Sequence, residues 1–99
     1  MTMKKGKFYV LYWFNGYALK TGLIDNIHGE RVGFYRERTE SGNFVWTSIH
    51  IETGYTIERS KNKDECIAKT IDFIPKLEQY EQYIKNGVEN MQEFLKTVA

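Results

Sequence analysis

The spacing of apolar residues changes once along the chain, near residue 60. Before this point, aromatic and β-branched runs are separated by short turn sequences at roughly ten-residue intervals, a pattern typical of an antiparallel meander. After it, apolar residues recur every three or four positions, as in amphipathic helices. The pattern predicts an α+β fold in a single domain, 1–99. We expect about five strands within 1–59 and one or two C-terminal helices within 60–99, packed on one face of the sheet.

The longest apolar run, from Phe8 to Phe14, is the first predicted strand. Its aromatic and β-branched residues favour a pleated, packed surface. It stops at Asn15-Gly16, the pair preferred in a type I′ hairpin turn, so residues 17–24 can pair back as the second strand. Gly22 inside that strand indicates a bulge or a close approach. Because both sides of the first strand are apolar, it is either a central strand or a strand with one side against a partner.

Three further strands are predicted at 31–38, 43–52 and 55–59. Turn residues separate them at 25–30, at 39–42 and at Thr53-Gly54. These turns are rich in Asn, Asp, His, Ser and Gly, which tolerate left-handed backbone geometry or bond to nearby backbone groups. A single helical layer would then shelter one side of the sheet and leave aromatic rings on the other.

The first helix is predicted after a polar segment at 60–65. Asn62 or Asp64 is the expected N-cap. Ile67, Ile71 and Ile74 follow at helical spacing and form an apolar stripe. Pro75 ends or kinks this helix, or opens the next one within its first turn.

A long amphipathic helix is predicted from Lys76 onward. Its apolar positions repeat at intervals of three and four, at Leu77, Tyr80, Ile84, Val88, Met91, Leu95 and Val98. Asn86-Gly87 is its weak point and marks a candidate break, since glycine in a helix interior costs about 1 kcal/mol relative to alanine. Tyr83 and Phe94 lie off the main stripe, so this helix, or a strand edge, is a candidate homodimer interface.

Composition narrows the functional classes. The net charge is +1 and 15% of the residues are aromatic. A near-zero net charge produces no general attraction to nucleic acid or anionic lipid. The single cysteine excludes an internal disulfide and agrees with a reducing compartment. No signal peptide and no apolar segment long enough to span a membrane is present. We therefore expect a cytoplasmic protein with no membrane partner.

Few residues suggest catalysis. His50 and Glu52 share one side of a strand, but the Cys pair that accompanies His-x-Glu in zinc deaminases is missing. His28 and His50 are not spaced as a metal site requires, and Cys66 near a helix start is more readily a packed residue than a nucleophile. A small enzyme would need a pocket that joins His50, Glu52 or Cys66. We expect no catalytic residues, no metal and no cofactor.

The N-terminal part of the chain is both basic and aromatic. Residues 1–38 carry seven Lys and Arg against three Asp and Glu, whereas residues 39–99 carry seven against ten. Bases of single-stranded nucleic acid stack on aromatic rings of open sheets while cations hold the phosphates. The candidate residues for this role are Lys4, Lys5, Lys7, Lys20, Arg31, Arg36 and Arg38 with Tyr9, Trp13, Tyr17 and Tyr35. The alternative is that these rings form the core.

Residues 46–57, followed by 63–68, form a strand, a Thr-Gly turn, a second strand and a helix start. This segment, about a quarter of the chain, resembles small accessory proteins encoded by phages and other mobile elements of low-GC Gram-positive bacteria. The Lys, Asn, Ile and Tyr usage is similar to theirs. The resemblance implies a compact protein that binds and blocks a host protein, such as a defence nuclease, in the host cytoplasm. It carries over no functional residue.

Together these patterns predict a non-catalytic protein-binding module. The aromatic surplus is typical of a recognition surface, because Tyr, Trp and Arg dominate binding energies at interfaces. Trp13, Tyr35, Arg36 and Arg38 are the expected partner-binding residues. The expected partner is a host or phage protein, and the activity that the resemblance implies is inhibition of a bacterial defence enzyme such as a CRISPR nuclease. Nucleic-acid binding is the alternative.

Overall fold

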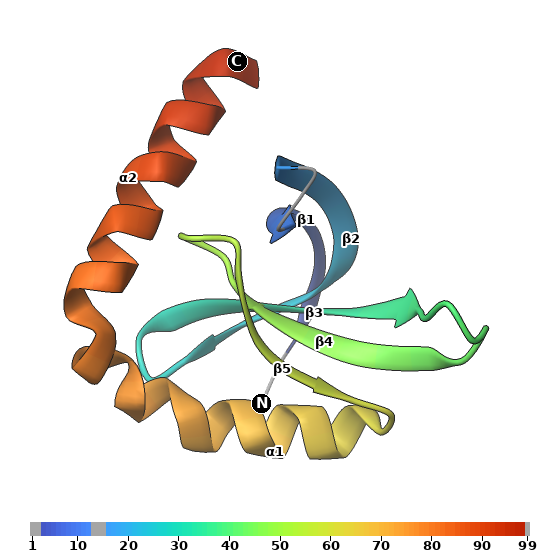
Figure 1. Cartoon of the computed structure of the whole chain (residues 1–99). Coiled ribbons are helices and arrows are strands. Elements are labelled where there is room, and N and C mark those ends of the chain that lie inside the picture. The colour runs from blue at the N-terminus through green and yellow to red at the C-terminus, as the bar shows by residue number, and fades with distance from the viewer. Residues whose placement is uncertain (1–2, 13–15, 99) are drawn as a thin grey trace.

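The computed structural model describes residues 3–12 and 16–98, and Figure 1 shows their arrangement. Five strands form one antiparallel sheet in the order β1-β2-β3-β4-β5, and the helices follow it. The α+β meander predicted from the sequence is confirmed. The elements are β1 (Lys4–Tyr12), β2 (Gly16–Ile27), β3 (Glu30–Arg38), β4 (Phe44–His50), β5 (Tyr55–Ser60), α1 (Lys63–Phe73), the 3₁₀ helix η1 (Ile74–Tyr80) and α2 (Glu81–Val98).

Several predicted boundaries are wrong, and β1 begins at Lys4 rather than at Phe8. The turn expected over 25–30 occupies only His28 and Gly29, because β2 stays paired with β3 as far as Ile27. Both turn residues have positive φ, 50° and 85°, as a two-residue hairpin loop of the I′ type requires. The fourth strand ends at His50 rather than at residue 52, since the His50 carbonyl accepts the N–H groups of Thr53 and Gly54 and turns the chain. The first predicted turn includes Asn15, which lies outside the described residues.

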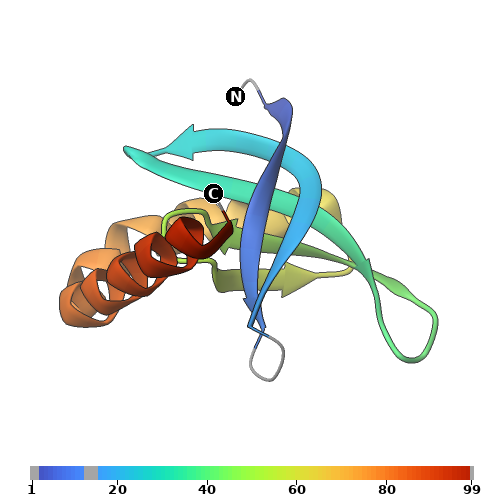
Figure 2. The ribbon, with the colours of Figure 1, turned by 90° about the horizontal axis from the view of Figure 1, so that it is seen from above.

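The β1–β2 hairpin folds over the rest of the sheet because β2 changes partners at Gly22. Residues 16–22 pair with β1 alone, and pairing with β3 starts only at Leu23. A Cβ atom at Gly22 would lie 2.1 Å from the Phe34 carbonyl oxygen. The close approach predicted at Gly22 is therefore confirmed. Figure 2 shows the hairpin crossing above the sheet.

This folding creates a core between the hairpin and the sheet. Phe8, Val10, Tyr35 and Ile49 are all buried there. A Cβ atom on Gly33 would lie 2.8 Å from the Phe8 ring, so the ring packs directly on the backbone of β3. The Leu11 N–H donates to the Gly54 carbonyl at 2.9 Å and ties β1 to the β4–β5 turn. The expectation of an open, ring-bearing sheet face is corrected, because the chain's own hairpin covers that face.

A second core lies between the sheet and α1. It contains buried Val32 and Phe34 of β3 together with Cys66 and Ile74, and the predicted stripe residues Ile67 and Ile71 pack against it. Two buried hydroxyls pair with each other here, since the Thr70 hydroxyl donates to the Ser48 oxygen at 2.7 Å. Burial of apolar surface at about 25 cal/mol per Å² drives the docking of the helix.

The helix ends follow local chemistry. The Asn62 side chain accepts the Glu65 N–H at 3.1 Å, so Asn62 rather than Asp64 is the N-cap of α1. The helix ends at Phe73, and Pro75 lies near the start of η1, where a missing N–H is tolerated.

The predicted long C-terminal helix divides differently from expectation. Residues 74–80 are 3₁₀, and α2 then runs unbroken through Gly87, so the break expected there is wrong. Gly87 allows α2 to pack closely on Tyr55, because a Cβ atom added at this position would lie 2.7 Å from the Tyr55 ring. Farther along α2, the Phe94 ring lies 4.9 Å from that of Tyr9 and 4.4 Å from that of Tyr17. Within residues 3–12 and 16–98, no helix combines the length and apolarity needed to cross a membrane.

We expect Gly22→Ala to lower the free energy of unfolding by about 3 kcal/mol, because the added methyl group would meet a backbone oxygen that cannot move aside. Gly6→Ala is the matched control. Its methyl group would meet only the flexible end of Ile24, so we expect a loss below about 1 kcal/mol. Urea unfolding followed by circular dichroism measures both. Equal losses for the two variants would contradict the role of the bend.

Candidate functional site

The four predicted partner-binding residues do not form one surface. Arg36 and Arg38 are exposed and share the outer side of β3. Tyr35 points to the opposite side and is only 4% exposed, so it is a core residue rather than a contact residue. Trp13 lies outside the described residues. The structure therefore brings the two arginines together and separates Tyr35 from them.

The arginines lie where the β3–β4 hairpin becomes a two-stranded ribbon, with Arg36 at the base of the ribbon and Arg38 within it. Residues 35–38 of β3 pair with β4 but not with β2, whose pairing stops at Phe34. On the other side, β5 pairs with β4 only as far as Trp46. The tip of the β3–β4 hairpin thus projects beyond the rest of the sheet, as Figure 2 shows. Its outer side is available to another molecule.

The outer side of this ribbon combines cations with aromatic rings. The Arg36 and Arg38 guanidinium carbons lie 4.4 and 5.0 Å from the centroid of the Phe44 ring. The Lys63 ammonium at the start of α1 lies 5.3 Å from the centroid of Trp46. Cations at this distance are attracted by the ring quadrupole. We call these residues (Arg36, Arg38, Phe44, Trp46 and Lys63) the ribbon patch.

The charges of the ribbon patch are unneutralised. Within the described ranges, none of its three cations forms an ion pair. Phe44 remains 43% exposed beside the two arginines. Stacking on Phe44 restricts both guanidinium groups before any partner arrives, which reduces the entropy lost on binding. The patch can therefore bind carboxylates or phosphates and pack on an apolar group beside them.

Sequence reasoning missed Phe44, Trp46 and Lys63 as members of this surface. The register pairs Arg36 with Trp46 and Arg38 with Phe44. Alternation along two paired strands would have placed all four on one side, had the register been known. The signal that could have found it is the Thr39–Gly42 turn, whose length sets the register of the hairpin. Lys63 joins them only through the path of the chain into α1.

The basic and aromatic N-terminal set does not form an open stacking platform. Tyr9 and Tyr17 pack against Phe94 of α2, and Tyr35 lies in the core beneath the hairpin. The Lys20 ammonium lies over the Tyr12 and Tyr35 rings at 5.5 and 5.8 Å. The described rings of this set therefore serve mainly packing, as the alternative interpretation held.

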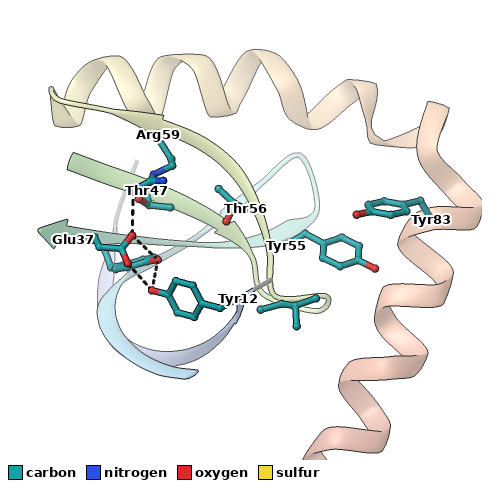
Figure 3. Close-up of a pocket in the computed structure, with 9 residues that line it drawn as sticks. Tyr12, Glu37, Thr47, Tyr55, Thr56, Arg59 and Tyr83 are labelled. Carbon is teal, nitrogen blue, oxygen red and sulfur yellow. Dashed lines mark hydrogen bonds and ion pairs between the residues drawn. The ribbon is translucent and has the colours of Figure 1, made fainter. Parts of the chain in front are cut away.

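A second feature lies where the hairpin and the sheet separate. Here a cavity of about 510 Å³ is lined by residues from β1, β3, β4, β5 and α2. Figure 3 shows the polar groups on its wall. We call it the mouth pocket. Its lining residues are Leu11, Tyr12, Tyr35, Glu37, Thr47, Tyr55, Thr56, Arg59 and Tyr83.

A hydrogen-bonded group centred on Glu37 lies on the wall of the mouth pocket. The Tyr12 hydroxyl donates to one carboxylate oxygen at 2.7 Å, and the Tyr35 hydroxyl donates to the other at 3.4 Å. Burial, followed by hydrogen bonds to Tyr35 and Glu37, raises the pKa of Tyr12 far above its ordinary value, and burial also raises the pKa of Tyr35. Both tyrosines are therefore neutral donors to a carboxylate near pH 7.

The residues considered for catalysis do not share a site. His50 is buried, with Nε2 2.8 Å from Glu30 Oε2 and Nδ1 3.0 Å from Thr53 Oγ1, so it braces the β4–β5 turn. Glu52 is exposed, and Cys66 is buried in the core beneath α1. In the part of the chain that the structure describes, no three His, Cys, Asp or Glu side chains are placed to hold a metal ion.

Comparison of the chain with protein-family models, with curated proteins and with solved structures gives no match.

We expect Cys66 to be unreactive in the folded protein. It is fully buried, and burial raises the pKa of its thiol, whereas the thiolate is the reactive form. Because it is the single cysteine, the Ellman reaction at pH 8 reports on it alone. The folded protein should react at least about tenfold more slowly than protein in guanidinium chloride, since reaction requires local opening. Rapid stoichiometric reaction of the folded protein would contradict this burial.

Proposed function

We propose that this protein is a non-catalytic protein-binding module that uses the ribbon patch to hold an acidic surface of its partner. The observation that carries the proposal is the pair Arg36 and Arg38 beside the exposed Phe44 ring, without a counter-ion among the described residues. An unneutralised cation pair at a projecting tip supports recognition more than it supports stability, because exposed charges contribute little to folding.

The composition of the ribbon patch supports a protein partner. Arg and large aromatic residues are enriched among the residues that dominate interface energies. Arg36 and Arg38 can each bind a carboxylate through two parallel hydrogen bonds, and Phe44 offers apolar contact beside them. A projecting ribbon of this kind can enter a groove on a larger protein. The partner we propose is a host or phage protein with Asp and Glu side chains around an apolar depression.

The resemblance to phage and mobile-element accessory proteins suggests the class of partner. On that basis we propose inhibition of a bacterial defence enzyme, such as a CRISPR nuclease, in the host cytoplasm. Binding without chemistry would block such an enzyme by occupying a surface it needs. The absence of shared geometry among His50, Glu52 and Cys66 supports a role without catalysis.

Nucleic-acid binding is a second candidate, and the same patch favours it. Two-stranded ribbons can enter the major groove of DNA, and cations beside rings suit phosphates and bases. Two observations favour protein instead. The net charge is only +1, and the remaining described rings of the basic N-terminal set are packed against the chain itself. Three cations would provide few phosphate contacts.

The test compares the wild-type chain with Arg36→Glu/Arg38→Glu in affinity purification from host lysate, followed by mass spectrometry. A partner retained by the wild type and lost by the variant is then purified and titrated by calorimetry. We expect the double substitution to weaken binding at least about 100-fold, because each charge-assisted contact contributes about 1.5–3 kcal/mol.

Lys4→Glu/Lys5→Glu is the matched control, because it makes the same charge change on exposed residues of β1 and should leave the affinity within about threefold. Fluorescence anisotropy with single-stranded and duplex oligonucleotides at low salt runs in parallel. Binding of an oligonucleotide that weakens steeply with salt, combined with no partner protein, would replace this proposal with the nucleic-acid one. Equal binding by the arginine variant would remove the ribbon patch from either role.

We also propose that α2 supports a homodimer, because apolar side chains remain exposed near both of its ends. Tyr83 is 61% exposed and Val98 is 50% exposed. Exposed apolar side chains of this size favour association when they are contiguous with another apolar surface. Light scattering after gel filtration should give twice the chain mass of 11.7 kDa, and Val98→Glu should return the monomer. A wild-type monomer at high concentration would contradict this assembly.

A further inference from the structure

Three residues of the mouth pocket form a row across the sheet. Tyr35 of β3 is directly opposite Thr47 of β4, and Thr47 is directly opposite Arg59 of β5. Residues directly opposite on neighbouring strands have their side chains on the same side, about 5 Å apart. The row therefore presents a phenol, a hydroxyl and a guanidinium on one side of the sheet along the wall of the cavity, and Figure 3 labels its members Thr47 and Arg59.

The middle member of this row lacks a partner. Thr47 is 1% exposed, and its hydroxyl oxygen forms no hydrogen bond within the described residues. Buried hydroxyls are nearly always paired, and an unpaired one costs free energy. Arg59 lies directly opposite it on β5 and lines the same cavity. Asp25 Oδ2 and Ser60 Oγ are also buried without a hydrogen-bond partner among the described residues, but of the three residues only Thr47 lines the mouth pocket, where a bound group could supply the missing partner.

The charged members of the pocket are only weakly engaged with each other. The distance from the Arg59 Nη2 atom to the Glu37 Oε2 atom is 3.5 Å, which is longer than the about 2.8 Å of a well-formed charged hydrogen bond. Among the described residues the Arg59 guanidinium pairs with Glu37 alone, and 55% of its side chain is exposed. A guanidinium has five donors in a fixed fork, so Arg59 retains donors for an anionic group. Glu37 can likewise accept further donors.

An aromatic wall borders the same cavity. The rings of Tyr55 and Tyr83 are stacked with their centroids 4.6 Å apart, and Leu11 lies beside them. Tyr83 comes from α2 and is mostly exposed, so its ring can shift to admit another ring. Stacked and edge-on aromatic contacts contribute about 0.5–1.5 kcal/mol beyond the area that they bury. The pocket thus combines a zwitterionic end with an aromatic end.

We propose that the mouth pocket binds a free aromatic α-amino acid. The ligand carboxylate forms an ion pair with Arg59 and accepts a hydrogen bond from the Thr47 hydroxyl. The ligand ammonium group forms an ion pair with Glu37. The ligand ring packs on Tyr55 and Tyr83. One ligand would then replace a long internal ion pair with two short ones and pair the buried hydroxyl. The cavity volume of about 510 Å³ accommodates such a ligand and lies in the ordinary range for small-molecule sites.

The probe is L-phenylalanine, titrated into the ¹⁵N-labelled protein and followed by NMR, including the side-chain Nε signal of Arg59. We expect saturable shifts at Thr47 and Arg59. N-acetyl-L-phenylalanine lacks the ammonium group and L-phenylalaninamide lacks the carboxylate. Each should bind at least about tenfold more weakly, because each leaves one charge of the pocket unpaired.

Substitutions assign each end of the ligand. Arg59→Gln and the near-isosteric Thr47→Val should weaken L-phenylalanine at least about tenfold and leave L-phenylalaninamide unchanged. Glu37→Gln should weaken L-phenylalanine and leave the N-acetyl derivative unchanged. Arg36→Gln, on the opposite side of β3, should leave the affinity for L-phenylalanine unchanged. Arg59→Gln should leave partner binding by the ribbon patch unchanged. The two proposals therefore fail separately.

Three results would overturn the proposal. One is the absence of any shift up to about 10 mM L-phenylalanine, which corresponds to a binding free energy too weak for a built site. Another is equal affinity for L-phenylalanine and both derivatives. The third is retention of L-phenylalanine affinity in Arg59→Gln and Glu37→Gln, with folding of both variants verified by their NMR spectra.

Discussion

Two positions that lack side chains allow this fold. Gly22 is in backbone contact with Phe34, and Gly33 receives the Phe8 ring directly on its backbone. Any Cβ atom at either position would separate β2 from β3 or lift Phe8 out of the core. Because both contacts are made, β2 changes partners and carries β1 across the sheet. The core of Phe8, Val10, Tyr35 and Ile49 follows from this bend.

The bend also explains why two surfaces remain for function. The β1–β2 hairpin covers the middle of the sheet but leaves the tip of the β3–β4 hairpin unpaired on its outer edges, which becomes the ribbon patch. The Leu11 N–H of β1 donates to the Gly54 carbonyl of the β4–β5 turn, and the mouth pocket lies beside this contact, lined by residues of both β1 and β5. The ribbon patch thus lies on the part of β3 and β4 that projects beyond the sheet, and the mouth pocket lies between the β1–β2 hairpin and the sheet.

Polar groups support the same arrangement. His50 is buried between Glu30, at the start of β3, and Thr53, in the turn that Leu11 contacts. Buried polar groups with complete partners fix one geometry, since each broken bond leaves an unpaired group. Among the described residues, Asp25 Oδ2, Thr47 Oγ1 and Ser60 Oγ are buried without a hydrogen-bond partner, and of these three residues only Thr47 lines the mouth pocket.

The sequence by itself determined the elements and their order. Apolar periodicity and turn chemistry predicted five strands, and they limited the N-cap to Asn62 or Asp64 and the helix boundary to the neighbourhood of Pro75, because these features depend on residues close together in the chain. Residues Arg36 and Arg38 could be chosen as candidates from their exposed, charged positions on a strand. Tyr35 could not be assigned from sequence, because an aromatic ring on a strand suits a core and an interface equally well.

Only the tertiary structure decided which surfaces exist. From the sequence, Gly87 is a candidate helix break, but in the structure it lies against the Tyr55 ring. Phe94 lies off the predicted apolar stripe, but in the structure it packs on Tyr9 and Tyr17. The row of Tyr35, Thr47 and Arg59 joins three strands, and its register depends on turn lengths and on a bulge at Ser48 and Ile49. Contacts between residues distant in sequence carry no local signature, and these contacts place both candidate sites.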